Sequence, residues 1–98
     1  MFICNQNKNR SVTAEKVFRE KYDTRSAGLY NEKPVTEEEL EWADLVVVME
    51  DGQRSEIGKR FPKQYMKKQI VSLDIEDVYK CDDPKLVELL LVFSKGFK

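Results

Sequence analysis

The chain has 98 residues, of which 41% are apolar and 36% are charged, a length and composition that predict one compact domain over residues 1–98. Its net charge of -1 argues against nucleic acid or an anionic membrane as the main partner, and no apolar run is long enough for a membrane span. The absence of His excludes imidazole chemistry, and two Cys without a ligand-like spacing lead us to expect neither a metal nor a cofactor.

The first predicted strand is the short apolar run at residues 1–3, and a polar segment separates it from a helical pattern over about Ser11 to Tyr22. A strand, a tight loop and a helix start in this order gather backbone N–H groups at the positive end of a helix dipole. Such an arrangement binds phosphate-like anions. The residues that we expect to form this cradle around a bound group are Asn5, Gln6, Asn7, Lys8, Asn9 and Ser11.

Two reactive side chains bracket this loop, because Cys4 opens it and Arg10 closes it with five residues between them. A thiol beside a guanidinium and a helix N-terminus ionises readily, so Cys4 is the candidate nucleophile and Arg10 the candidate cation for a phosphate. A free reactive thiol of this kind suits a reducing cytoplasm. The same spacing also arises when a buried Cys and a solvated Arg share a loop by coincidence, and the pair alone does not separate the two interpretations.

The middle of the chain predicts a strand, a helix and another strand. A turn leads into a short second strand that ends at Gly28. Thr36 and Glu39 form a capping box, which predicts that a second helix begins there. The β-branched run at residues 45–49 is typical of a strand that is covered on both faces.

The last part of the chain repeats this alternation. Asp51 should cap a third helix that Pro62 ends, and residues 69–73 should form a fourth strand. An acidic loop over residues 74–83 then leads to a last helix, which Asp83-Pro84 should start. The apolar surface of that helix is wider than one sheet face needs, so it is a candidate surface for a homodimer.

Four strands alternating with four helices predict a three-layer α/β fold: a four-stranded parallel sheet in the order 2-1-3-4 with helices on both faces. Ligands bind such sheets beyond the carboxyl ends of the strands, where the loops after the first and fourth strands both lie. Phosphoryl transfer to a thiolate also needs an acid that protonates the departing oxygen. The candidates for this acid are Asp74, Asp77, Asp82 and Asp83, of which the last is best used as a helix cap.

The combination resembles the low-molecular-weight protein tyrosine phosphatases, most closely a short microbial branch of that family, over nearly the whole chain. The matching pieces, in chain order, are Cys4-x5-Arg10-Ser11 with Asn7, Ala14-Glu15, Ser26-Ala27-Gly28, Glu41 through Met49, Leu73-Asp74-Ile75, Asp77-x-Tyr79 and Asp83-Pro84. The resemblance implies a hydrolase without a cofactor that acts on phosphotyrosine or a small aryl phosphate.

The resemblance also implies a role for each matching residue of the loop. Cys4 would be the nucleophile that forms a phosphocysteine, and Arg10 would hold the equatorial oxygens. Ser11 would favour the thiolate, and Asn7 would support the loop. The acid of the family, an aspartate two residues before a tyrosine, would be Asp77.

The chain departs from the family pattern at several positions. Gln6 stands where glycine is usual, which should narrow the cradle or strain the backbone, and Val78 replaces the proline that usually follows the acid. Asn9 replaces the second loop cysteine, which in many relatives shields the nucleophile through a disulfide. The segment 29–34 is much shorter than the part that walls the aromatic pocket of larger relatives.

Tyr79, two residues after the candidate acid Asp77, is an aromatic side chain that we expect to contact the substrate.

Two other functions remain open. An arsenate reductase would need a relay of further thiols, and Cys81 is the only other one in the chain. A non-catalytic phosphate-binding domain would keep the cradle but lack a pocket wall, which the short segment 29–34 and Gln6 favour. Hydrolysis of a simple aryl phosphate separates a phosphatase from the binding domain.

Overall fold

A four-stranded parallel sheet forms the centre of the structure, a computed structural model that describes residues 1–94. The strands are β1 (Phe2–Cys4), β2 (Ser26–Gly28), β3 (Leu45–Val48) and β4 (Gln69–Ser72). Their order is β2-β1-β3-β4 and every pair is parallel, which confirms the predicted sheet.

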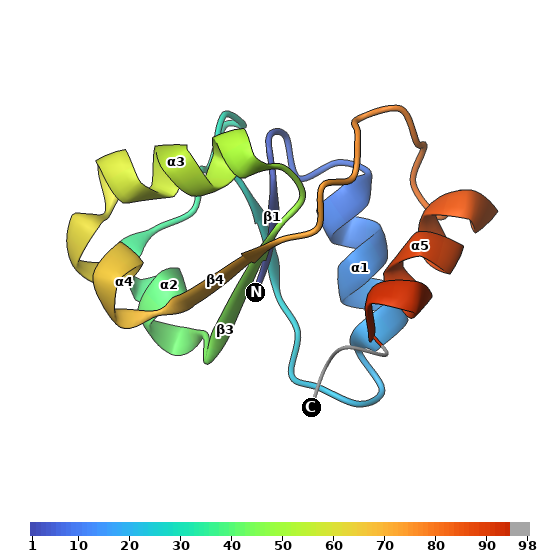
Figure 1. Cartoon of the computed structure of the whole chain (residues 1–98), viewed down its shortest axis with the longest axis horizontal. Coiled ribbons are helices and arrows are strands. Elements are labelled where there is room, and N and C mark those ends of the chain that lie inside the picture. Colours follow the sequence, from blue (N-terminus) through green and yellow to red (C-terminus); the bar gives the residue numbers. More distant parts are fainter. Residues whose placement is uncertain (95–98) are drawn as a thin grey trace.

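Helices cover both faces of this sheet, as predicted. They are α1 (Arg10–Phe18), α2 (Glu37–Trp42), α3 (Asp51–Arg60), α4 (Pro62–Lys67) and α5 (Pro84–Ser94). Figure 1 shows α2, α3 and α4 on one side of the strands and α1 with α5 on the other. No helix within the described residues is long and apolar enough to cross a membrane.

The alternation of side chains along the strands produces two separate apolar clusters. Ile3 and Val46 belong to the cluster beneath α2 and α3, whereas Phe2, Cys4 and Val47 belong to the cluster beneath α1 and α5. Neighbouring residues of a strand point to opposite faces, so each strand contributes to both clusters. Cys4 is consequently buried on the α1 side, directly before the loop that leads into α1.

The helix caps predicted at Thr36 and Asp83 are confirmed. The Thr36 hydroxyl accepts from the Glu39 amide at 3.2 Å, while the Thr36 amide donates to Glu39 Oε1 at 3.0 Å. At the last helix, Asp83 Oδ1 accepts from the Lys85 amide at 2.9 Å. These bonds satisfy amide groups that have no partner within the first turn of a helix.

Two predictions about the helices need correction. The first helix ends at Phe18 and not at Tyr22, and the Tyr22 side chain is exposed. The third helix ends at Arg60, before Pro62 as predicted, but Pro62 also opens the additional helix α4, since a proline fits the first turn, where no amide is needed. The chain therefore has five helices in its described part and not the four predicted.

The third helix also starts one residue earlier than the expected cap implied. Glu50 is its N-cap and Asp51 is already its first helical residue. On α5, Leu86 and Leu90 are buried, whereas Leu89, Leu91 and Val92 are exposed. A homodimer through this exposed face stays a prediction.

Candidate active site

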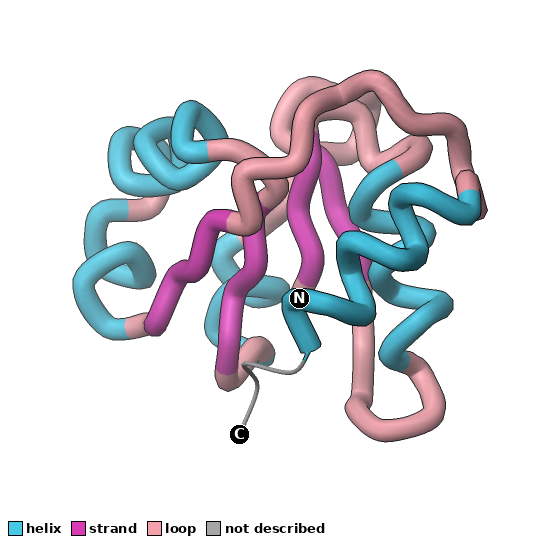
Figure 2. The backbone as a smooth tube through the Cα atoms, turned by 45° about the vertical axis from the view of Figure 1, so that its right-hand side comes forward, coloured by secondary structure: helices cyan, strands magenta, loops and turns pink. Residues whose placement is uncertain are grey.

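The loop of residues 4–11 lies at the carboxyl end of β1. Figure 2 shows this end of the sheet, where the loops after the strands gather at one edge. The segment after β2 holds the loop from outside, because the Tyr30 amide donates to the carbonyl of Asn5 at 2.8 Å. Gly28 permits this close approach, since a Cβ there would lie only 3.0 Å from the Asn5 carbonyl oxygen.

Cys4 lies in a chain of three polar side chains that all belong to this loop. Its Sγ is 2.9 Å from Ser11 Oγ, which donates to Asn7 Oδ1 at 2.8 Å. The Ser11 hydroxyl has one proton, and that proton can turn to Cys4 once the thiol has lost its own. Ser11 is therefore placed to stabilise a thiolate.

The backbone of the loop makes its left-handed bend at Asn7, whose φ is 51°. Asparagine tolerates this region better than most residues. Gln6 itself is not among the described residues with a positive φ, so the expected backbone strain is not found there, and the alternative expectation of a narrowed cradle stays a prediction. The side chains of Gln6 and Lys8 are exposed, and both remain predicted contacts of a bound group.

Arg10 is 1% exposed and is held by partners from two other parts of the chain. Its Nη1 donates to Glu50 Oε1 and, at 2.7 Å, to the carbonyl of Ile75. These two bonds use both protons of Nη1, so the Nε and Nη2 donors form the edge that remains for a ligand. A guanidinium binds two oxygens of a phosphate through such an edge.

Asp77 is the one predicted acid that contacts the arginine of the loop in the described residues. Its Oδ1 lies 3.6 Å from Arg10 Nε, and its side chain is 59% exposed. Asp82 instead pairs with Lys16 on α1 at 3.1 Å, and Asp83 caps α5. The geometry thus brings Asp77 to the cradle from a distant part of the sequence.

Two residues at the start of α3 support the loop and were missed by the sequence analysis. Glu50 holds Arg10, as described above, and Gln53 Nε2 donates to Asn5 Oδ1 at 3.1 Å. Gln53 Oε1 accepts from the amides of Met49 and Glu50 at 2.8 and 3.1 Å, which fixes its side chain. The available signal was their position directly after β3, at the same edge of the sheet as Cys4.

The remaining predicted residues lie near the loop in different roles. Asn9 turns its side chain to the last part of the acidic loop, where its Oδ1 accepts from the Cys81 amide at 3.1 Å. Tyr79 is half-buried and packs against the apolar cluster beneath α1 and α5. Its contact with a substrate stays a prediction.

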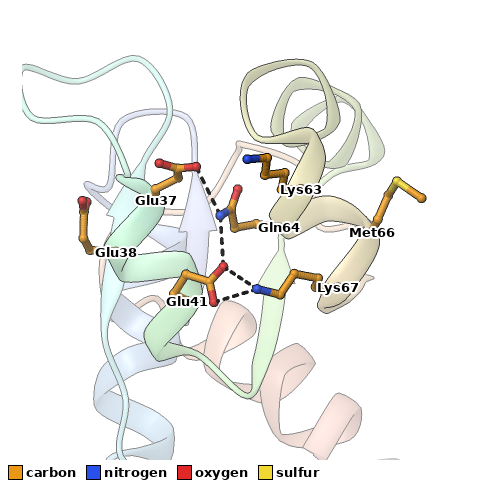
Figure 3. Close-up of a pocket in the computed structure, with 7 residues that line it drawn as sticks. All are labelled: Glu37, Glu38, Glu41, Lys63, Gln64, Met66 and Lys67. Carbon is orange, nitrogen blue, oxygen red and sulfur yellow. Dashed lines mark hydrogen bonds and ion pairs between the residues drawn. The ribbon is translucent and has the colours of Figure 1, made fainter.

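A hollow of about 660 Å³ lies elsewhere, between α2 and α4, and contains no residue of the loop 4–11. Its lining residues are Glu37, Glu38, Glu41, Lys63, Gln64, Met66 and Lys67 (Figure 3). The described residues contain no group of three acidic, Cys or His side chains that could hold a metal ion. The loop itself brings together a thiol, a guanidinium and a carboxylate.

The sequence matches no protein-family model and no curated protein. Solved structures do match. The low-molecular-weight protein tyrosine phosphatase from T. tengcongensis is 21% identical with a TM-score of 0.75, and the match covers 96% of this chain and 90% of that one. The YwlE arginine phosphatase from Geobacillus stearothermophilus is 19% identical with a TM-score of 0.76, over 97% and 89% of the two chains.

A third match is Wzb from Vibrio vulnificus in complex with benzylphosphonate. It is 18% identical with a TM-score of 0.79, and the match covers 98% of this chain and 96% of that one. At these identities the likeness establishes the fold. The chain has the fold of the low-molecular-weight protein tyrosine phosphatases, as its resemblance to that family predicted.

Proposed function

We propose that a protein with this fold and this loop hydrolyses phosphate monoesters through a cysteinyl-phosphate intermediate on Cys4. The observation that carries the proposal is the convergence on one loop of a buried thiol 2.9 Å from Ser11, the buried Arg10 and the carboxylate of Asp77. A nucleophile, an anion-binding cation and a proton donor are the three groups that the reaction needs.

In the first step, the Cys4 thiolate attacks the phosphorus atom as the bond from phosphorus to the leaving oxygen breaks. The Nε and Nη2 edge of Arg10 and the amides at the start of α1 hold the non-bridging oxygens, whose charge grows in the transition state. Asp77 gives its proton to the leaving oxygen, which departs as an alcohol or phenol.

In the second step, a water molecule attacks the phosphorus of the cysteinyl-phosphate. Asp77, now a carboxylate, takes a proton from the water, and the sulfur leaves as a thiolate. Inorganic phosphate is released and both side chains return to their starting protonation states. Ser11 assists this step because its hydroxyl proton can turn to the departing sulfur.

The substrate class we propose is phosphotyrosine or a small aryl phosphate. Tyr30 supports it, since this exposed ring belongs to the residue whose amide is hydrogen-bonded to Asn5 of the cradle. The Arg60 guanidinium stacks on the ring, 5.0 Å from its centroid. Because one structurally similar protein is described as an arginine phosphatase, phosphoarginine is the comparison substrate to assay.

The test is hydrolysis of phenyl phosphate, phosphotyrosine and phosphoarginine by the wild type and by Cys4→Ser, with Cys81→Ser as the matched control. We expect turnover by the wild type and the control only, and a phosphorylated Cys4 peptide after an acid quench. Inorganic phosphate should also slow alkylation of Cys4 by iodoacetamide. Phosphate protection of Cys4 without turnover of any substrate would identify a non-catalytic anion-binding domain instead.

A further inference from the structure

The segment that carries Asp77, residues 74–83, is bent back sharply at both ends, and we call it the acid loop. Asp74 and Asp82 have φ angles of 57° and 62°, in the left-handed region that few residues other than glycine adopt. Such conformations persist only where surrounding contacts hold them. The contacts at the two ends of the acid loop therefore determine where Asp77 lies.

The front end of the acid loop is attached to the sheet and to the cradle. The Ile75 amide donates to the Met49 carbonyl at 2.7 Å, which extends the pairing of β4 with β3 beyond the strands. The Ile75 carbonyl accepts from Arg10 at 2.7 Å, and its side chain is buried. This attachment fixes the chain two residues before Asp77.

The rear end is attached to the start of α1 by two side chains one helical turn apart. Asn9 Oδ1 accepts from the Cys81 amide at 3.1 Å, and Thr13 Oγ1 accepts from the Asp82 amide at 2.9 Å. The Thr13 hydroxyl donates its own proton to the Asn9 carbonyl at 2.7 Å, so the two acceptors are joined. Two consecutive amides of the acid loop thus find their partners beside the cradle.

We propose that Asn9 is a positioning residue for Asp77, acting through this rear attachment and not on the bound phosphate. The inference rests on the proposed function, because it assigns Asp77 the acid role. An amide oxygen is a strong acceptor for a backbone amide, whereas a thiol at the same position is a weak one. Many members of the phosphatase family that this chain resembles have a cysteine at the position of Asn9. In this chain, the residue at that position docks the acid loop.

Asn9 is the residue to test because its partner Thr13 is completely buried and its replacement would disturb packing as well. Asn9 is only half-buried, and no side-chain bond of Asn9 caps α1. Its replacement should therefore leave the fold intact. A misplaced acid slows mainly those substrates whose leaving group needs protonation, which provides a readout that a change in the cradle would not give.

The experiment measures the ratio of kcat/KM for phenyl phosphate to kcat/KM for 4-nitrophenyl phosphate, because this quantity covers the step in which the leaving group departs. We expect Asn9→Ala to lower this ratio by about threefold to tenfold, the rate equivalent of one hydrogen bond. Asn9→Asp keeps the acceptor oxygen and should restore the ratio, since any effect of its charge on phosphate binding acts on both substrates. Asn31→Ala, an equal truncation on the other side of the cradle, should leave the ratio unchanged.

The double variant with Asp77→Asn decides how Asn9 acts. Once the acid is removed, Asn9→Ala should cause no further loss, because both changes affect one proton transfer. An equal loss with both substrates, or additive losses in the double variant, would show that Asn9 acts on the cradle and would overturn the proposal.

A measurement without turnover separates this proposal from the proposed function. Amide hydrogen exchange at Cys81 should be faster in Asn9→Ala than in the wild type, and the acid loop should exchange faster with it. Unchanged exchange would refute the docking even in a protein that hydrolyses phosphate esters. Faster exchange in a protein without turnover of any substrate would leave the docking standing and refute the function.

Discussion

The loop of residues 4–11 and the acid loop lie at the same edge of the sheet, but they are held in different ways. Within the first loop, Cys4, Asn7 and Ser11 bond to one another over at most seven positions, and Tyr30 and Gln53 add contacts from outside. The acid loop is attached through residues of β3, the cradle and α1, such as Met49, Arg10 and Thr13. The first loop therefore combines internal with external contacts, whereas the acid loop is placed by its surroundings.

This difference separates binding from proton transfer. The internal contacts of the first loop keep the nucleophile and the hydroxyl that supports its thiolate together. An acid that must reach the leaving oxygen depends on long-range contacts that a distant substitution can loosen. Substitutions in the first loop should therefore affect every substrate, and substitutions around the acid loop should affect substrates according to their leaving group.

Arg10 is shared by the two loops, and its replacement should have the largest effect. Arg10→Lys keeps a positive charge but cannot bond Glu50, Ile75 and two phosphate oxygens at once. We expect kcat/KM to fall by about 10³-fold or more, as when donors to a developing charge are removed. Arg25→Lys, at the opposite end of the sheet, is the matched control. A small loss in Arg10→Lys would show that the fork geometry is not needed.

Asp77→Asn should separate the function of the acid loop from that of the loop of residues 4–11. Phenyl phosphate should be hydrolysed about 10²- to 10⁴-fold more slowly, the usual contribution of a positioned acid, and 4-nitrophenyl phosphate should suffer less. Steady-state rates for both substrates measure this effect. Asp74→Asn and Asp82→Asn remove equal charges from the same loop and should change little. If the three variants behave alike, the loop acts only through its overall charge.

Glu50→Gln tests the contact that orients Arg10 from outside both loops. The loss of a charge-assisted hydrogen bond should lower kcat by about tenfold. Binding of phosphate or vanadate should not weaken, because a negative charge near the anion is removed at the same time. Titration with vanadate and a kcat measurement give both quantities. Glu41→Gln, which affects the pair with Lys67 away from both loops, serves as the control, and weaker anion binding in Glu50→Gln would contradict this role.

The contact between α2 and α4 is a reference region away from both loops, and it should give the smallest effect. Lys67 donates to Glu41 at 3.1 Å (Figure 3), and this hydrogen bond lowers the pKa of Glu41. A carboxyl group whose pKa is lower in the folded protein than in the unfolded chain stabilises the folded state at pH values above its ordinary pKa. This stabilisation is lost as the pH falls through the pKa of the folded state.

Lys67→Met should accordingly lower the Tm slightly at pH 7, and the difference from the wild type should shrink and then vanish as the pH falls below the ordinary pKa of a glutamate and Glu41 becomes protonated. Turnover at pH 7 should be unchanged, because neither loop is involved. Thermal unfolding monitored by circular dichroism at several pH values checks the first expectation. A Tm difference that grows toward low pH would have the wrong sign for this ion pair.

The sequence by itself determined the parts of this protein that depend on local patterns. The caps at Thr36 and Asp83, the strand at β3 and the strand-loop-helix order around Cys4 all follow from residues a few positions apart. Such patterns report backbone preferences and the side of an element that is buried, so they also predicted the parallel sheet with helices on both faces. The resemblance to a phosphatase family then selected Asp77 among several acids that position alone did not distinguish.

Only the tertiary structure decided which groups hold the cradle and the acid loop. Arg10 meets Glu50 and the Ile75 carbonyl across 40 and 65 positions, and Asn9 meets the Cys81 amide across 72. No local pattern contains such pairs, because they form only when the parallel sheet brings the carboxyl ends of its strands to one edge. The Glu50 carboxylate and the Ile75 carbonyl belong to this site because the fold brings them close to Arg10. The residue types Glu and Ile alone do not indicate that role.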